Sequence, residues 1–169
     1  MHVNFMKDDS GRDILQIDGA RIKNRNFSGE RGGEYDREGK RNFLWAIDDP
    51  ELAEELLARG WPVKIYPPKD EDGDANMFMK VSLSYNDAGY GPRVYLRSGN
   101  ARVRLNADTI KRLDEISIDS VDMDIRAYDW TYAGRSGRSA YLNAIRVTQR
   151  MDRFEDEFED NDYYEENPF

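Results

Sequence analysis

The sequence has no cysteine and a single histidine, His2. Without cysteine there is no disulfide, no thiolate nucleophile and no cysteine-ligated zinc. One imidazole near the start of the chain cannot build a Ser-His-Asp triad or a histidine-ligated zinc site. We therefore expect a protein that is not an enzyme and that holds neither a metal nor a cofactor.

Long hydrophobic runs are missing as well. None is long enough to span a bilayer, and residues 1–10 contain Lys7, Asp8 and Asp9 where a signal peptide would be apolar. We expect a soluble protein of the cytoplasm, which would be the host cytoplasm if the source is a virus. An aromatic content of 12% is too high for a chain that is disordered throughout, so most of the 169 residues should fold.

Acidic residues outnumber basic ones by 34 to 25, for a formal charge of −9. Eight of these acids lie between Glu155 and Phe169, a stretch without any basic residue, so residues 1–154 are close to neutral. Like charge at this density opposes collapse. The sequence predicts one folded domain over residues 1–151 and a disordered acidic tail over residues 152–169.

Three segments of the body combine arginine with aromatic residues: 21–43, 90–104 and 126–150. The second has a turn at Ser98-Gly99-Asn100, which predicts a β-hairpin. Strand alternation would bury one set of its side chains and expose the other. The buried set is Val94, Leu96, Val103 and Leu105. The exposed set is Arg93, Tyr95, Arg97, Arg102 and Arg104.

The remaining pattern predicts a mainly β protein. Strands are expected near residues 14–27, 41–47, 63–66, 77–85, 121–130 and 140–149, the last two joined by a basic loop at 134–139. Asp49 and Asp108 are expected to cap two short helices, of which the first ends at Gly60. Trp45 and Trp61 are expected in the core. We predict an OB-like antiparallel barrel of five to seven strands with two short helices and the disordered tail.

Arginine interleaved with aromatic rings on a strand face suits single-stranded nucleic acid, because guanidinium groups follow phosphates while the rings stack on unpaired bases. Each segment could also be an ordinary solvated strand face. Candidate DNA contacts in the hairpin are Arg93, Tyr95, Arg97, Arg102 and Arg104. Candidates outside it are Arg25, Phe27, Arg41, Tyr128, Trp130, Arg135 and Arg138.

Two acidic groups could indicate metal chemistry. Asp119, Asp122 and Asp124 are close enough in sequence to suggest a magnesium-dependent nuclease, but carboxylates on a strand are more often solvated surface. The loop 70–74 resembles a calcium loop whose glycine is misplaced and whose final ligand position holds Val81, so we interpret it as a polar turn.

The body resembles the single-stranded DNA-binding proteins of tailed phages. The resemblance covers residues 21–148 and rests on Asn26-Phe27-Ser28-Gly29, Arg41-Asn42-Phe43, Gly60-Trp61, the run 81–85 and Tyr128-Asp129-Trp130. It implies binding of single-stranded DNA without strong sequence preference, protecting it during replication or recombination.

The end of the tail resembles the acidic tip of bacterial and phage proteins of this kind, which recruits replication, repair and recombination proteins. That resemblance implies partner contacts by Glu165, Glu166, Pro168 and Phe169. The tail could also occupy the basic groove until DNA displaces it. The sequence leaves open a homo-oligomer, and two rival functions: an acidic DNA mimic that inhibits a host nucleic-acid enzyme, and a structural or RNA-binding OB module.

Overall fold

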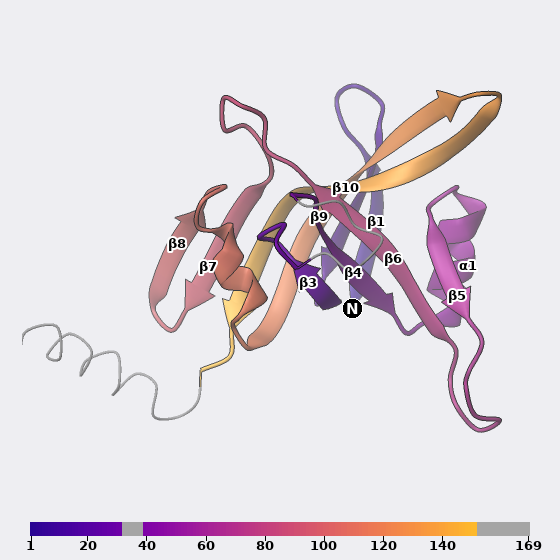
Figure 1. Cartoon of the computed structure of the whole chain (residues 1–169). Coiled ribbons are helices and arrows are strands. Elements are labelled where there is room, and N and C mark those ends of the chain that lie inside the picture. The colour runs from indigo at the N-terminus through magenta and orange to yellow at the C-terminus, as the bar shows by residue number, and fades with distance from the viewer. Residues whose placement is uncertain (32–38, 152–169) are drawn as a thin grey trace, which may run out of the picture.

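The computed structural model describes residues 1–31 and 39–151. The secondary structure of this part of the chain is mainly β-strand, with one short α-helix and one 3-10 helix (Figure 1). The helical segments are α1 (Pro50–Ala58) and η1 (Ile110–Asp114). The strands are β1 (His2–Lys7), β2 (Asp13–Asp18), β3 (Arg21–Asn26), β4 (Arg41–Ile47), β5 (Val63–Tyr66), β6 (Asn76–Leu83), β7 (Arg93–Ser98), β8 (Ala101–Leu105), β9 (Ile118–Tyr132) and β10 (Arg135–Gln149).

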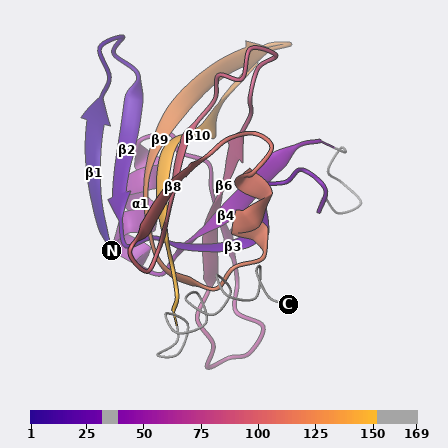
Figure 2. The ribbon, with the colours of Figure 1, turned by 90° about the vertical axis from the view of Figure 1, so that its left-hand side faces the viewer.

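All of these strands belong to one sheet. Its main path runs β1-β2-β9-β10-β6-β4-β3, with β5 paired to β6, and with β7 placed between β10 and β8. The β1–β2 hairpin stands at one side of the sheet in Figure 2. The path ends at β1 and β3 without joining them, so the sheet is not closed. The mainly β class is confirmed, and the arrangement is consistent with an OB-like fold.

Two features of the sheet differ from the prediction. It has ten strands rather than five to seven, and β10 pairs in parallel with both β6 and β7. The reason is the length of β10. Its residues Ala140 and Tyr141 pair with β6, a register shift follows between Leu142 and Ala144, and residues 144–148 then pair with β7. One strand thus changes partner along one edge while β9 occupies the other.

The predicted strand over residues 14–27 is two strands, which lie in different parts of the sheet. Gly19, with a positive φ of 71°, turns the chain between β2 and β3. The corner is held by β9, because Gly19 donates its N–H to the Asp122 carboxylate at 3.0 Å and Ala20 donates to the Val121 carbonyl at 2.8 Å. The first strand, β1, was not predicted at all.

The helix after Asp49 forms as predicted. The Asp49 carboxylate accepts the Glu51 N–H at 3.0 Å, and Pro50 occupies the first turn of the helix. Gly60 follows the C-terminal end of the helix with a φ of 89°. The second predicted helix is instead the 3-10 helix η1. Asn106, not Asp108, organises its start, since the Asn106 side chain accepts the N–H groups of residues 108 and 109.

The curved sheet encloses one hydrophobic core. Trp45 is fully buried and Trp61 is 2% exposed, which confirms the prediction that both are core residues. The two apolar side chains of η1, Ile110 and Leu113, are also fully buried. Neither helical segment in the described ranges is long and apolar enough to cross a membrane.

Candidate nucleic-acid interface

The β7–β8 hairpin presents a basic, aromatic surface. In its antiparallel register Tyr95 lies opposite Arg104, and Arg97 lies opposite Arg102. Tyr95 is 38% exposed, and the Arg104 guanidinium carbon lies 5.9 Å from the centroid of its ring. No acidic residue occurs between positions 93 and 105. The predicted outward direction of these side chains is thus matched by the register.

The opposite face of the hairpin packs into the core, with one exception. Val94, Leu96 and Leu105 are buried as predicted, but Val103 is 41% exposed. β8 is the outer strand of the hairpin and is hydrogen-bonded to β7, and the core reaches beneath it only at Leu105. The prediction that Val103 is buried is therefore wrong.

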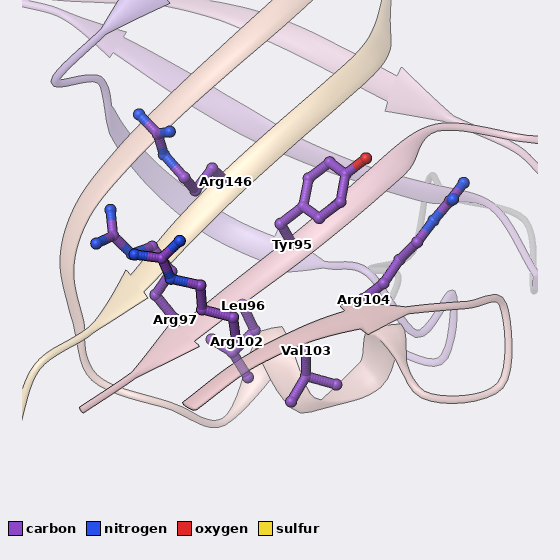
Figure 3. A pocket seen from close by; sticks show the side chains of 7 residues that line it. All are labelled: Tyr95, Leu96, Arg97, Arg102, Val103, Arg104 and Arg146. Carbon is purple, nitrogen blue, oxygen red and sulfur yellow. The ribbon is translucent and has the colours of Figure 1, made fainter. Parts of the chain in front are cut away.

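A third strand completes this surface. β10 runs parallel to β7 and places Arg146 beside Tyr95 in register. Figure 3 shows Arg146, Tyr95 and Arg97 around a shallow space beside the hairpin. This space, the hairpin groove, has a volume of about 490 Å³ and is lined by Tyr95, Leu96, Arg97, Arg102, Val103, Arg104 and Arg146. Arg146 is absent from the predicted contacts because its position beside Tyr95 depends on a pairing between strands far apart in the sequence.

Two carboxylates on β9 border the groove and differ in their electrostatics. Burial of Asp122 favours its neutral form, but hydrogen bonds from Arg146, at 2.6 Å, and from the Gly19 N–H outweigh it and lower its pKa. Burial raises the pKa of Asp124, and the nearby Asp18 raises it further against the opposing charge of Arg93. The charge of Asp122 is thus balanced by its ion pair with Arg146, whereas the charges of Asp124 and Asp18 repel each other.

The β9–β10 hairpin extends past its neighbours as an arm, at the upper right of Figure 1. Every second residue at this end of β9 is aromatic, so Tyr128, Trp130 and Tyr132 lie on the same face of the arm. They are 52%, 38% and 79% exposed. Gly137 lies opposite Trp130, and a Cβ atom on it would come within 2.5 Å of the indole ring. The turn is Ala133-Gly134, both with positive φ, rather than the predicted loop 134–139, whose other residues belong to β10.

Arg138 occupies the other face of the arm and contacts the body. It forms ion pairs with Asp129 at 2.7 Å and Asp13 at 2.9 Å, donates to the Arg59 carbonyl at 3.2 Å and lies over the Trp61 ring. Its side chain is only 13% exposed. Arg138 therefore braces the arm, whereas Arg135, across from Tyr132, remains exposed on the aromatic side.

The predicted contacts from segment 21–43 serve mainly to join loops to the body. Phe27 is fully buried and stacks on Phe43, so it offers no ring to a base in this structure. Arg25 donates to the carbonyls of residues 113 and 116, both at 2.7 Å, and Arg41 donates to those of residues 27 and 107. Arg41 also lies 5.4 Å from the Tyr85 ring centroid.

The predicted partner contacts Glu165, Glu166, Pro168 and Phe169 lie outside the described residues. Among those described, no group of three or more acidic or histidine side chains is placed to hold a metal ion. Asp119 lies at a register shift of the β9–β10 pair, outside the regular alternation that places Asp122 and Asp124 on one face.

The chain is similar to known proteins in sequence and in fold. A family described as "Putative phage ssDNA-binding domain" matches residues 7–167. The single-stranded DNA-binding protein of bacteriophage Enc34 in complex with ssDNA is similar in fold, with a TM-score of 0.54 and 12% identity over 90% of this chain and 98% of that one. A C-terminal truncation of that protein gives a TM-score of 0.52 and 10% identity over 89% of this chain and 96% of that one. No curated protein matches the sequence.

Proposed function

The chain belongs to the phage ssDNA-binding domain family, and we propose that it binds single-stranded DNA along the hairpin groove. One observation carries this proposal: Tyr95 is an exposed ring with Arg104 and Arg146 on the two neighbouring strands. The ring offers a face to an unpaired base, and the guanidinium groups reach the phosphates on both sides of it. Arg97 and Arg102 continue the cationic surface towards the turn.

This arrangement suits binding without sequence preference. Every base has a π-face, so stacking on Tyr95 is tolerant of sequence, and charge contacts to phosphates carry no base information. A duplex would satisfy the phosphate contacts but keep its bases stacked inside. The protein would therefore protect single strands during replication or recombination in the host cytoplasm.

The tail supplies the second part of the proposal. Residues 155–169 hold eight acidic residues and end in Pro168-Phe169. A basic pocket on a replication or recombination protein could take the carboxylates of Glu165 and Glu166 together with the terminal ring. Two features support this role: the sequence of the tip, and its resemblance to the partner-binding tips of related proteins.

The first experiment is a fluorescence-polarisation titration with labelled oligo-dT, duplex DNA and RNA at two salt concentrations. We expect salt-sensitive binding to oligo-dT and much weaker binding to duplex. Tyr95→Ala should remove a stack worth about 1 to 3 kcal/mol, which is a loss of roughly 5- to 150-fold in affinity. Tyr66→Ala is the control, because Tyr66 is also exposed but lies on β5 outside the groove. Equal affinity of wild type and Tyr95→Ala would reject the hairpin groove as the site.

A further inference from the structure

Two other grooves lie near the hairpin groove. One is acidic and the other is basic. The acidic groove shares Tyr95 and Arg146 with the hairpin groove and crosses β9 to β2. Its carboxylates are Asp18, Asp122 and Asp124. The fork groove lies where β6 and β10 separate, and its cationic side chains are Lys40, Arg41 and Lys80.

The acidic groove is unsuited to a polyanion. Of its three carboxylates only Asp122 has an ion-pair partner among the described residues, Arg146. Burial and the nearby Asp18 both disfavour the charged form of Asp124, and Arg93 opposes them only in part. A DNA strand laid over them would add phosphates to negative charge that Arg93 and Arg146 compensate only in part. The groove thus bounds the basic surface on the side of β2.

The fork groove has the opposite character. It has a volume of about 380 Å³, and none of the described residues that line it is acidic. Beside its three cations lie hydroxyl side chains that can bond to phosphate or base edges, namely those of Ser82, Ser84, Tyr85 and Tyr141, whereas Asn42 is buried. Tyr141 has Arg126 over its ring at 5.0 Å and Tyr128 against it edge-on at 6.0 Å. Ring, cation and hydroxyl groups therefore meet in one concave place.

The two basic grooves are connected through Tyr85. Its ring lies beneath Arg41 at 5.4 Å, and the charge of Arg104, in the hairpin groove, also acts on its hydroxyl. The Tyr85 ring can take this position only because residue 91 is a glycine. A Cβ atom on Gly91 would lie 2.4 Å from the ring. Tyr85 thus lines the fork groove beneath Arg41 and lies within electrostatic reach of Arg104.

From this charge pattern we propose that the fork groove is a second nucleotide-binding subsite, and that a bound strand passes from the hairpin groove over Tyr85 into it rather than across β9 to β2. The proposal rests on the proposed function, because it assigns the path of the same ligand. Its consequence is a length threshold. A short oligonucleotide can occupy the hairpin groove alone, whereas a longer one reaches both subsites.

The test compares oligo-dT of about 5 and about 15 nucleotides, lengths within the range known for single OB folds. Lys40→Gln removes one exposed charge from the fork groove. We expect it to lower the salt slope by about one for the long oligonucleotide and to leave the short one unchanged. Lys69→Gln is the matched control, since Lys69 lies between β5 and β6 outside the three grooves. Cross-linking of long 5-iodo-uracil oligonucleotides should label Tyr141 or Tyr85.

A third variant makes the outcomes separable. Asp18→Lys places a cation in the acidic groove, and it should change the binding of long and short oligonucleotides equally. Two results together would overturn the proposed path and place the strand over β9. In the first, Asp18→Lys steepens the salt slope for the long oligonucleotide alone. In the second, Lys40→Gln binds like the control Lys69→Gln. Loss of binding in Tyr95→Ala would still support the hairpin groove in that case. If Tyr95→Ala has no effect, the proposed function fails at its own site.

Discussion

Arg138 on β10 reaches Asp13 on β2, with Nη2 of the guanidinium 2.9 Å from Oδ2 of the carboxylate. The same guanidinium forms two hydrogen bonds to Asp129 across the arm, at 2.7 and 3.1 Å. One arginine therefore joins both strands of the arm to a third strand of the sheet. A bidentate pair of this kind requires the planar fork of arginine, which lysine cannot reproduce.

Arg138→Lys should accordingly destabilise the protein although it keeps the charge. We expect the free energy of unfolding in urea to fall by about 1 to 2 kcal/mol, because hydrogen bonds between charged groups are lost and the contact with Trp61 weakens. Arg135→Lys is the control, since Arg135 is exposed on the other face of the arm. Equal stabilities of these two variants would show that Arg138 does not brace the arm.

The acidic partners of Arg138 predict a dependence of stability on pH. The hydrogen bond from Lys7, supported by Arg138, lowers the pKa of Asp13, and the hydrogen bond from Arg138 lowers that of Asp129. Carboxylates with a lower pKa in the folded state stabilise it above their unfolded pKa of about 3.9, and this stabilisation disappears as the pH falls through their folded pKa values.

We therefore expect urea unfolding to show constant stability from these groups between pH 7 and 5, and a decline below about pH 4. Arg138→Gln should flatten this decline, because the cause of the low pKa of Asp129 is gone. The same slope with pH in wild type and variant would contradict the assignment.

Gly137 gives the Trp130 ring its place on the arm. Gly137→Ala would bring a methyl group within 2.5 Å of Cζ2 of the indole, so the ring must move. We expect a loss of about 1 kcal/mol in stability, at the low end for overpacking because the site is exposed, and a shift in the fluorescence of Trp130. In a Trp130→Leu background Gly137→Ala should cost much less, and an unchanged cost in this double-mutant cycle would contradict the contact.

Arg97 and Arg102 predict a trade-off between stability and binding. They are opposite each other in the hairpin register, and like charges in that position destabilise a strand pair by about 0.2 to 1 kcal/mol. Arg102→Gln should therefore raise the free energy of unfolding while it weakens binding to oligo-dT and lowers the salt slope by about one. Arg112→Gln, on the exposed side of η1, should leave the salt slope unchanged. A destabilised Arg102→Gln would argue that this arginine serves the fold.

The sequence by itself determined the class of the protein, the core tryptophans, the cap at Asp49 and the direction of the hairpin side chains. These depend on local rules, namely strand alternation, turn chemistry and charge, and they need no knowledge of neighbours. The same rules indicated arginine and aromatic residues as the chemistry of the proposed DNA site.

Only the tertiary structure decided which arginines remain available. Arg93 and Arg138 look alike in sequence, but Arg138 is held by Asp13, which lies on a distant strand, whereas Arg93 is exposed on the hairpin. Phe27 likewise stands beside arginines in the sequence and looks like a stacking residue. In the structure β3 packs against β4, and Phe27 is buried against Phe43. Arg146 joins the groove through a parallel pairing. Burial and long-range pairing depend on the whole chain at once, which no local pattern encodes.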